Sequence, residues 1–328
     1  MTPDFSIHNK PAATNGGVKP HRIDVHHHYV PPKYYAEISS KIPLRPVLRD
    51  WTPARTIEDM DKAGIETAIL SVTTPGLWFG DIAQTRRLAR ECNEYAARMV
   101  SDYPGRFRMW VALPLPDMEG SLRELEYGLD QLKALGVGLF TSYMEKYLGD
   151  PLFAPVLEEL NRRKAVLYTH PTVCQCCAEL LPFISEAVVE YGTDTTRTIA
   201  SLLFTGAAAR YADIPIIFSH SGGTMPYLFE RFILVSKLPH MVAHLPKGLL
   251  YEINKFHYDT AQSSNPGVTA CLRKIVSVPQ ILFGTDFPYR RGEEHVNGLR
   301  QCGYTDEELL CIERANALRL LPQLRAGA

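Results

Sequence analysis

The sequence carries almost no net charge. Its 328 residues contain 35 Lys and Arg against 36 Asp and Glu, which leaves a formal charge of −1. Proteins that bind nucleic acid or an anionic membrane surface usually show a basic excess, so this balance argues against both kinds of partner. A small molecule is therefore the expected partner.

Long hydrophobic runs are also missing. The longest apolar stretches, such as 199–209 and 214–218, are much shorter than a membrane-spanning helix, and residues 1–19 lack the apolar core of a signal peptide. These absences predict a cytoplasmic protein that has no membrane partner.

Cysteine is sparse and does not form a framework pattern. Seven cysteines, an odd number in a long chain, favour reduced thiols over a set of disulfides. Cys174, Cys176 and Cys177 form a cluster that could in principle bind metal, but the sequence has no second cysteine pair at zinc spacing. A loop with free thiols is the preferred interpretation.

The residues that are present predict one α/β barrel. Hydrophobic residues make up 45% of the chain, enough for a single large core. Residues 1–20, rich in Pro, Gly, Asn and Ala, predict a flexible N-terminal arm before one domain at 21–328. Eight strand-like runs are expected at 22–25, 66–72, 106–112, 137–141, 165–169, 214–219, 256–260 and 281–285. Amphipathic helical segments separate them at 81–101, 120–134, 151–164, 195–211 and 267–277, with a last one at 305–321. This alternation predicts a (β/α)8 TIM barrel.

Two connections are longer than ordinary barrel turns. Residues 29–55 follow the first strand and residues 172–194 follow the fifth. Long loops on the catalytic face commonly form lids or substrate walls, which is the expectation for both.

Potential metal ligands stand at the ends of several predicted strands. His26 and His28 end the first, His170 the fifth, His220 the sixth and Asp286 the eighth. Residues two apart on a strand point to the same side, so His26 and His28 can act together. With a further histidine and an aspartate they supply nitrogen and oxygen ligands that suit a cation such as zinc. The alternative is that each histidine is separately a packed residue of the core or a capping residue.

The fourth predicted strand limits the chemistry. Two-metal hydrolases on similar barrels often need a carboxylated lysine there, but residues 136–141 contain none, which favours a mononuclear site. His220 precedes Ser221, Gly222 and Gly223, small residues that leave its imidazole accessible. A histidine there suits general acid or base chemistry, and a further metal ligand or a cap remains the alternative.

These motifs resemble those of the amidohydrolase-related (amidohydrolase family 2) metal-dependent decarboxylases, the group that holds aminocarboxymuconate semialdehyde, resorcylate and 6-methylsalicylate decarboxylases. The resemblance covers about 21–321 and includes the non-catalytic segments 93–95, 104–107, 141–143 and 147–151. It implies that a divalent metal, zinc or alternatively Mn2+ or another ion, is held by His26, His28, His170 and Asp286. It also implies that His220 is the catalytic histidine.

The resemblance also directs attention to arginines that could hold a carboxylate. Arg231 lies eleven residues after His220, the offset at which related enzymes place an arginine in the neighbouring subunit's site. This implies a homodimer with Arg231 shared across the interface, whereas a helix-surface ion pair is the alternative. In the first long connection, Arg49 is preferred over Arg45 as a second carboxylate-binding residue.

Further substrate contacts are expected near two strand ends. Trp78 and Phe79 follow the second strand and could sandwich a planar ring, although rim packing explains them equally well. Tyr289 and Arg290 stand three and four residues after Asp286 and could contact substrate, with a solvated basic turn as the alternative.

The expected function is non-oxidative, zinc-dependent decarboxylation that releases CO2 from a small carboxylic acid. The substrate class is a 2-hydroxybenzoate-type aromatic acid, such as 6-methylsalicylate, or a related unsaturated acid. His220 or Asp286 delivers the proton, and the sequence does not choose between them. The alternative is a mononuclear, lactonase-like hydrolase on the same fold.

Overall fold

The computed structural model of the protein describes residues 21–172, 174, 177 and 180–327. The predicted N-terminal arm at 1–20 lies outside the described residues, as does Cys176. None of the helices in the described part of the chain is long and apolar enough to cross a membrane.

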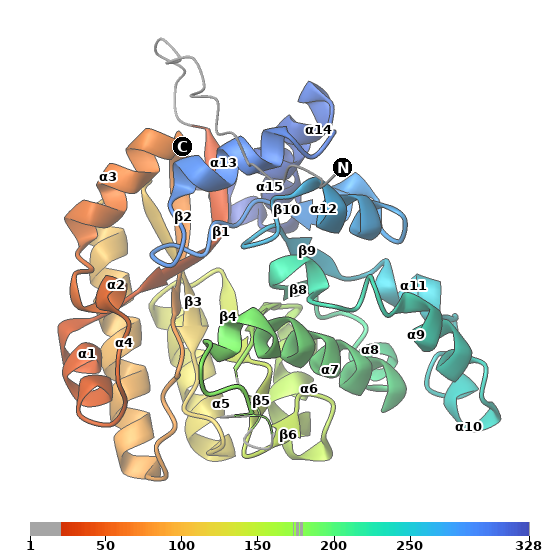
Figure 1. Ribbon diagram of the computed structural model, residues 1–328. Helices are drawn as coiled ribbons and strands as arrows, with labels where there is room; N and C mark the ends of the chain where they lie inside the picture. The colour runs from red at the N-terminus through yellow and green to blue at the C-terminus, as the bar shows by residue number, and fades with distance from the viewer. Residues whose placement is uncertain (1–20, 173, 175–176, 178–179, 328) are drawn as a thin grey trace.

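Eight parallel strands form the centre of the molecule, as Figure 1 shows. They are ordered β1-β2-β3-β4-β7-β8-β9-β10, which confirms the predicted barrel. The strands are β1 (Arg22–Tyr29), β2 (Ile65–Val72), β3 (Phe107–Ala112), β4 (Gly136–Phe140), β7 (Val166–His170), β8 (Ile216–Phe218), β9 (His257–Asp259) and β10 (Ile281–Leu282). The chain after β10 closes the barrel against β1, because the Val25 amide donates to the Phe283 carbonyl at 3.0 Å and the His28 amide to the Phe287 carbonyl at 2.8 Å.

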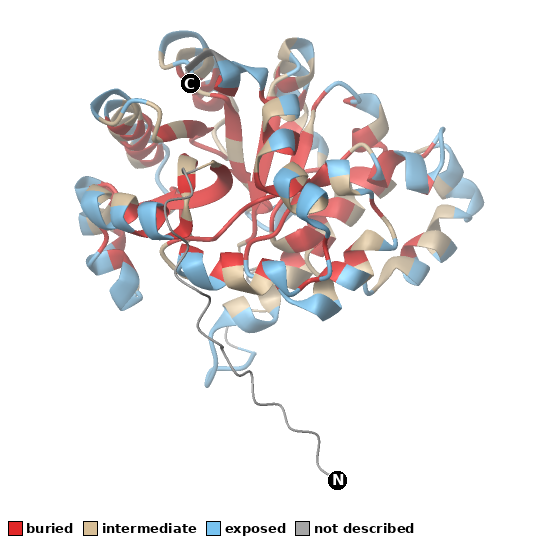
Figure 2. Cartoon of the chain, turned by 90° about the horizontal axis from the view of Figure 1, so that it is seen from above, coloured by how far each residue is buried: buried red, intermediate tan, exposed pale blue. Residues whose placement is uncertain are grey.

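Helices surround the strands. They are α1 (Pro32–Ser39), α2 (Pro46–Arg49), α3 (Pro53–Ala63), α4 (Ile82–Asp102), α5 (Met118–Glu126), α6 (Ala154–Arg163), α7 (Glu190–Phe204), α8 (Ala207–Arg210), α9 (Phe229–Ser236), α10 (Pro239–Val242), α11 (Leu249–Ile253), α12 (Pro266–Arg273), α13 (Gly292–Arg300), α14 (Asp306–Leu310) and α15 (Asn316–Leu320). A short hairpin of β5 (Ser142–Tyr143) and β6 (Lys146–Tyr147) follows β4. The buried faces of the helices point to the barrel and their exposed faces outward (Figure 2).

Two sequence expectations change in the structure. β1 runs to Tyr29 instead of ending at 25, and all eight of its residues are buried, so His26 and His28 lie within the strand. The connection after it is not an open loop, because it contains the helices α1 and α2. Each of these short helices begins with a proline, whose fixed φ suits the first helical turn.

The interior of the barrel is filled below its carboxyl-terminal mouth. Trp110 and Tyr168 stack with ring centroids 5.7 Å apart, and the Trp110 indole N–H donates to the Val25 carbonyl at 3.0 Å. Ile69 and Ile217 pack in the same buried cluster. This plug makes the barrel a packed core and leaves the mouth as the place for a site.

Candidate metal centre

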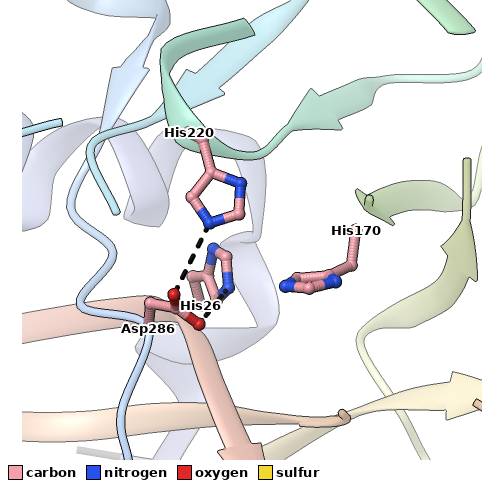
Figure 3. Close-up of side chains that lie close together, drawn as sticks. All are labelled: His26, His170, His220 and Asp286. Carbon is pink, nitrogen blue, oxygen red and sulfur yellow. Dashed lines mark ion pairs between the residues drawn. The ribbon is translucent and has the colours of Figure 1, made fainter. Parts of the chain in front are cut away.

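Three imidazoles and one carboxylate converge at the mouth of the barrel. The Nε2 atom of His28 lies 3.2 Å from Nε2 of His26 and 3.2 Å from Nε2 of His170. Oδ1 of Asp286 lies 3.2 Å from Nε2 of His26 and 3.1 Å from Nε2 of His28. All four residues are buried. Figure 3 shows His26, His170 and Asp286 pointing toward one another from separate parts of the barrel.

The other ring nitrogen of each imidazole is held by an oxygen. These Nδ1 contacts are His26 to Asp259 Oδ2 at 2.8 Å, His28 to Ser71 Oγ at 3.0 Å and His170 to the Pro171 carbonyl at 2.8 Å. Carboxylate and carbonyl acceptors at Nδ1 fix the proton there and direct the Nε2 lone pair inward, as in metal-ligating histidines. The inward-facing Nε2 atoms and the Asp286 carboxylate thus offer lone pairs to one point, as the ligands of a divalent cation do. The residues present fit such an ion.

The electrostatics of the cluster favour a cation. Burial opposes the charging of His26, but the attraction of Asp259 and Asp286 outweighs it and raises the pKa of His26 to about 10. Burial also opposes ionisation of Asp286, yet attraction by His26 and hydrogen bonding with neighbouring histidines hold the pKa of Asp286 well below its usual range. Burial lowers the pKa of His170 well below its ordinary value, which keeps this imidazole neutral. Two buried carboxylates therefore attract positive charge to one point.

His220 lies beside this cluster. It opens the turn His220–Gly222 after β8, with φ of 53° at His220 and 56° at Ser221. Its Nε2 lies 3.6 Å from Asp286 Oδ2 (Figure 3). Its backbone N–H donates to Asp259 Oδ1 at 2.9 Å. His26, His170, His220 and Asp286 each place one possible ligand atom within 4.8 Å of the others, a position from which His220 can exchange a proton beside the cluster or act as a further ligand.

Gln262 fixes the orientation of the Asp286 carboxylate. Its side-chain amide donates to Asp286 Oδ2 at 3.0 Å, on the oxygen that also faces His220. Oδ1 faces the imidazoles, 3.2 Å from Nε2 of His26 and 3.1 Å from Nε2 of His28. The two oxygens are therefore distinct: Oδ1 suits the metal and Oδ2 suits a proton partner.

A buried clamp joins the two segments that carry the ligands. The Asp24 carboxylate accepts from the His26 amide at 3.1 Å, from the Thr285 amide at 3.1 Å and from the Thr285 hydroxyl at 2.6 Å. His27 faces away from the cluster, bonds Asp24 through Nδ1 at 2.9 Å and stacks on Phe287 at 4.7 Å. These contacts hold β1 against the chain around Asp286. Strand pairing between the two segments is reduced to a single bridge, between His27 and Phe287.

The arginines of the first connection are arranged differently from the sequence preference. The structure places Arg49 at the surface, where Nε bonds Asp50 Oδ1 at 2.9 Å and the side chain is 65% exposed. Arg45 instead stands 4.9 Å over the ring of Tyr289, whose centroid is 5.8 Å from that of His28. The geometry therefore favours Arg45 over Arg49 at the mouth of the site.

The other expected substrate residues are dispersed. Trp78 and Phe79 are half-buried, and Phe79 packs on the core with Lys41 Nζ 5.2 Å from its ring. Arg290 is half-buried and its Nη1 lies 3.5 Å from Nδ1 of His295, away from solvent. Arg231 is exposed on α9. The backbone N–H groups of Tyr289 and Arg290 donate to the Asp286 carbonyl at 2.8 and 3.3 Å, and the Tyr289 ring also contacts that of His28.

Several residues of the site were missed by the sequence reasoning. Asp259 stands one residue before the end of the predicted strand 256–260, a position that could have identified it. Tyr191, in the first turn of α7, has its ring centroid 6.0 Å from that of His170 and donates its hydroxyl to Thr74 Oγ1 at 3.1 Å; no motif marks it. Among the described residues, the group able to hold a metal contains no cysteine, and the Cys177 thiol instead lies 3.5 Å from Arg197 Nη2.

The chain belongs to the amidohydrolase family, whose model matches residues 23–323. It is 34% identical to the 6-methylsalicylic acid decarboxylase acuB of Aspergillus aculeatus, over 93% of this chain and 97% of that protein. It is 33% identical to the decarboxylase yanB of Aspergillus niger, over 94% and 89% of the two chains. A solved dihydroxybenzoic acid decarboxylase from Polaromonas, with bound manganese and an inhibitor, shares the fold with a TM-score of 0.79 at 23% identity, covering 92% of this chain and 97% of that one.

The cluster predicts how two histidine variants differ in metal content. The purified protein should carry about one divalent ion per chain. His170→Ala should lose this ion, because one of its four ligands is removed. His220→Ala should keep both the ion and the fold. Elemental analysis beside circular dichroism measures both properties. Full metal retention in folded His170→Ala would contradict the ligand assignment, and metal loss in folded His220→Ala would make His220 a ligand.

Proposed function

We propose that the protein is a metal-dependent carboxy-lyase that removes CO2 from a small 2-hydroxybenzoate-type aromatic acid, for example 6-methylsalicylate. The observation that carries the proposal is the convergence of His26, His28, His170 and Asp286 on one buried point, with His220 beside it. Similarity to decarboxylases along more than nine-tenths of the chain supports it.

The residues of the site divide the chemistry among them. A divalent ion held by the four ligands supplies Lewis-acid attraction for the carboxylate and phenolic oxygens of the substrate. His220 and Asp286 share the polar contact beside the cluster, so one of them holds the proton for the ring carbon. When the bond from ring to carboxyl breaks, its electron pair stays on the ring, the proton joins that carbon and CO2 leaves. Tyr191 and Tyr289 form the aromatic wall near the ligands.

Zinc is the proposed metal, because three imidazole nitrogens and one carboxylate form its common ligand set. Manganese, which the Polaromonas relative binds, is the alternative. Arg45 is proposed as the cation that faces the substrate's carboxylate, supported by its position over Tyr289. The proposed location is the cytoplasm.

A gas-release assay tests the proposed reaction. Purified protein should release one CO2 per molecule of acid consumed from at least one member of a panel containing 6-methylsalicylate and 2,3- and 2,6-dihydroxybenzoate. His220→Ala should lower kcat by about two to four decades, the usual scale for a lost acid–base group. A panel of lactones is assayed in parallel. Formation of ring-opened acids without CO2 release would contradict the decarboxylase proposal and support the lactonase-like hydrolase.

We also propose a homodimer in which Arg231 completes the partner's site. Arg231 is exposed on α9, and apolar side chains nearby are exposed as well: Tyr227 at 86% and Leu234 at 58%. Apolar surface of this kind is more typical of an interface than of a solvated face. A planar guanidinium would give a carboxylate two donors.

Complementation between inactive variants tests this sharing. His220→Ala and Arg231→Ala dimers should each have very low activity, and mixing them should restore roughly a quarter of the wild-type rate. About half of randomly exchanged dimers are hybrids, each with one intact site of two. Absence of recovery after demonstrated subunit exchange would place Arg231 outside the partner's site.

A further inference from the structure

Two tyrosines from distant parts of the chain contact the metal-ligand histidines. The Tyr191 ring lies nearly perpendicular to that of His170, with centroids 6.0 Å apart and planes at 79°. The Tyr289 ring contacts that of His28 in the same way, at 5.8 Å and 77°. Both tyrosines are half-buried. The two rings therefore border the metal cluster without supplying a ligand to it.

The hydroxyls of both rings are bonded to two consecutive threonines. Tyr191 donates to Thr74 Oγ1 at 3.1 Å, and the Tyr289 hydroxyl shares a hydrogen bond of 2.6 Å with Thr73 Oγ1. Thr73 and Thr74 directly follow β2, so one short segment holds a ring from α7 and a ring from the chain after β10. A half-buried side chain without such a bond can change its χ angles and turn toward solvent. The two bonds therefore restrict where both rings stand.

The segment that carries the threonines is itself held from two sides. The hydroxyl of the buried Tyr34, on α1, lies 2.9 Å from the Thr73 carbonyl and 3.1 Å from the Gly76 carbonyl, within donating distance of both. The Gly76 amide donates to the Thr73 carbonyl at 3.1 Å, which closes a tight turn. A Cβ on Gly76 would lie 2.7 Å from Cε2 of Phe140, at the end of β4, so the turn packs closely on that ring. The threonines thus stand on a rigid support.

We propose that Thr73 and Thr74 are positioning residues of the active site, which hold Tyr289 and Tyr191 at fixed angles against the metal ligands and so fix the shape of the aromatic wall. The inference rests on the proposed decarboxylase function. The threonines act only through the tyrosines, in the way that outer partners orient the groups of a metal site. A displaced wall leaves the metal ligands in place but misaligns the substrate with the proton donor, so it slows the chemical step more than it weakens binding.

A double-mutant cycle tests this indirect action on whichever acid of the panel releases CO2 fastest. Thr74→Val keeps the shape of the side chain without its hydroxyl. It should lower kcat about tenfold, the scale of one hydrogen bond, and change KM less than about threefold. Thr74→Ser returns the hydroxyl and should restore most of the lost rate. Tyr191→Phe should match Thr74→Val, and the variant with both changes should be no slower than either, because all three lose the same bond.

A matched control separates this role from a general loss of stability. Thr85 is buried on α4, and its hydroxyl donates to the Asp81 carbonyl at 2.7 Å. Thr85→Val therefore removes a comparable bond from the same residue type without touching either tyrosine, and should keep the wild-type kcat. All of these variants should retain the divalent ion by elemental analysis. The second pair should repeat the pattern, with Thr73→Val and Tyr289→Phe non-additive.

Several outcomes would overturn the inference while leaving the decarboxylase in place. These are a wild-type kcat in Thr74→Val, additive losses in the double variants, or loss of the ion together with the rate. A defect in Tyr191→Phe that Thr74→Val does not share would also overturn it, because the phenol would then act on the substrate directly. Failure of the wild type to release CO2 from any acid of the panel would reject the proposed function and the inference with it.

Discussion

Two carboxylates inside the barrel mouth set the conditions for the rest of the site. Asp259 and Asp286 are buried, and both bond the same imidazole, that of His26. A buried charge is costly unless it is paired, and the end of β9 and the segment after β10 bring the two carboxylates together. The arrangement needs positive charge between the two carboxylates, and the raised pKa of His26 indicates that its imidazole supplies some of it. A divalent cation at the Nε2 atoms would supply more, so the buried carboxylate pair favours metal binding.

The backbone around these groups is held in uncommon conformations. Among the described residues, eight other than glycine have positive φ, and four of them belong to the site: His220, Ser221, Gln262 and Asp286. Such conformations cost energy and persist where surrounding contacts determine them. Asp24 supplies several of those contacts through its bonds to the His26 and Thr285 amides. The stacked rings of Trp110 and Tyr168 below the mouth, and the Asp24 clamp between β1 and the chain around Asp286, therefore hold the metal ligands in position.

Periodicity was sufficient to predict the barrel, because short strand-like runs alternate with amphipathic helical segments along the chain. The ends of the predicted strands located His170 and Asp286, since the carboxyl ends of parallel strands share one edge. Periodicity could not show that Arg45, and not Arg49, lies over Tyr289, because that depends on the packing of α2, a single turn of helix. Gln262 was equally hidden, because its role comes from a left-handed backbone in an irregular loop.

The affinity of Asp259→Asn for Mn2+, measured by competition with a chelator, tests most directly whether the buried carboxylate pair creates the metal site. The substitution keeps the shape of the side chain but removes the charge behind His26, so the dissociation constant should rise about 10- to 100-fold. Asp59→Asn is the matched control, a buried carboxylate that instead accepts from the Gly292 amide at 2.9 Å and should leave the affinity unchanged. An unchanged affinity in folded Asp259→Asn would contradict the account.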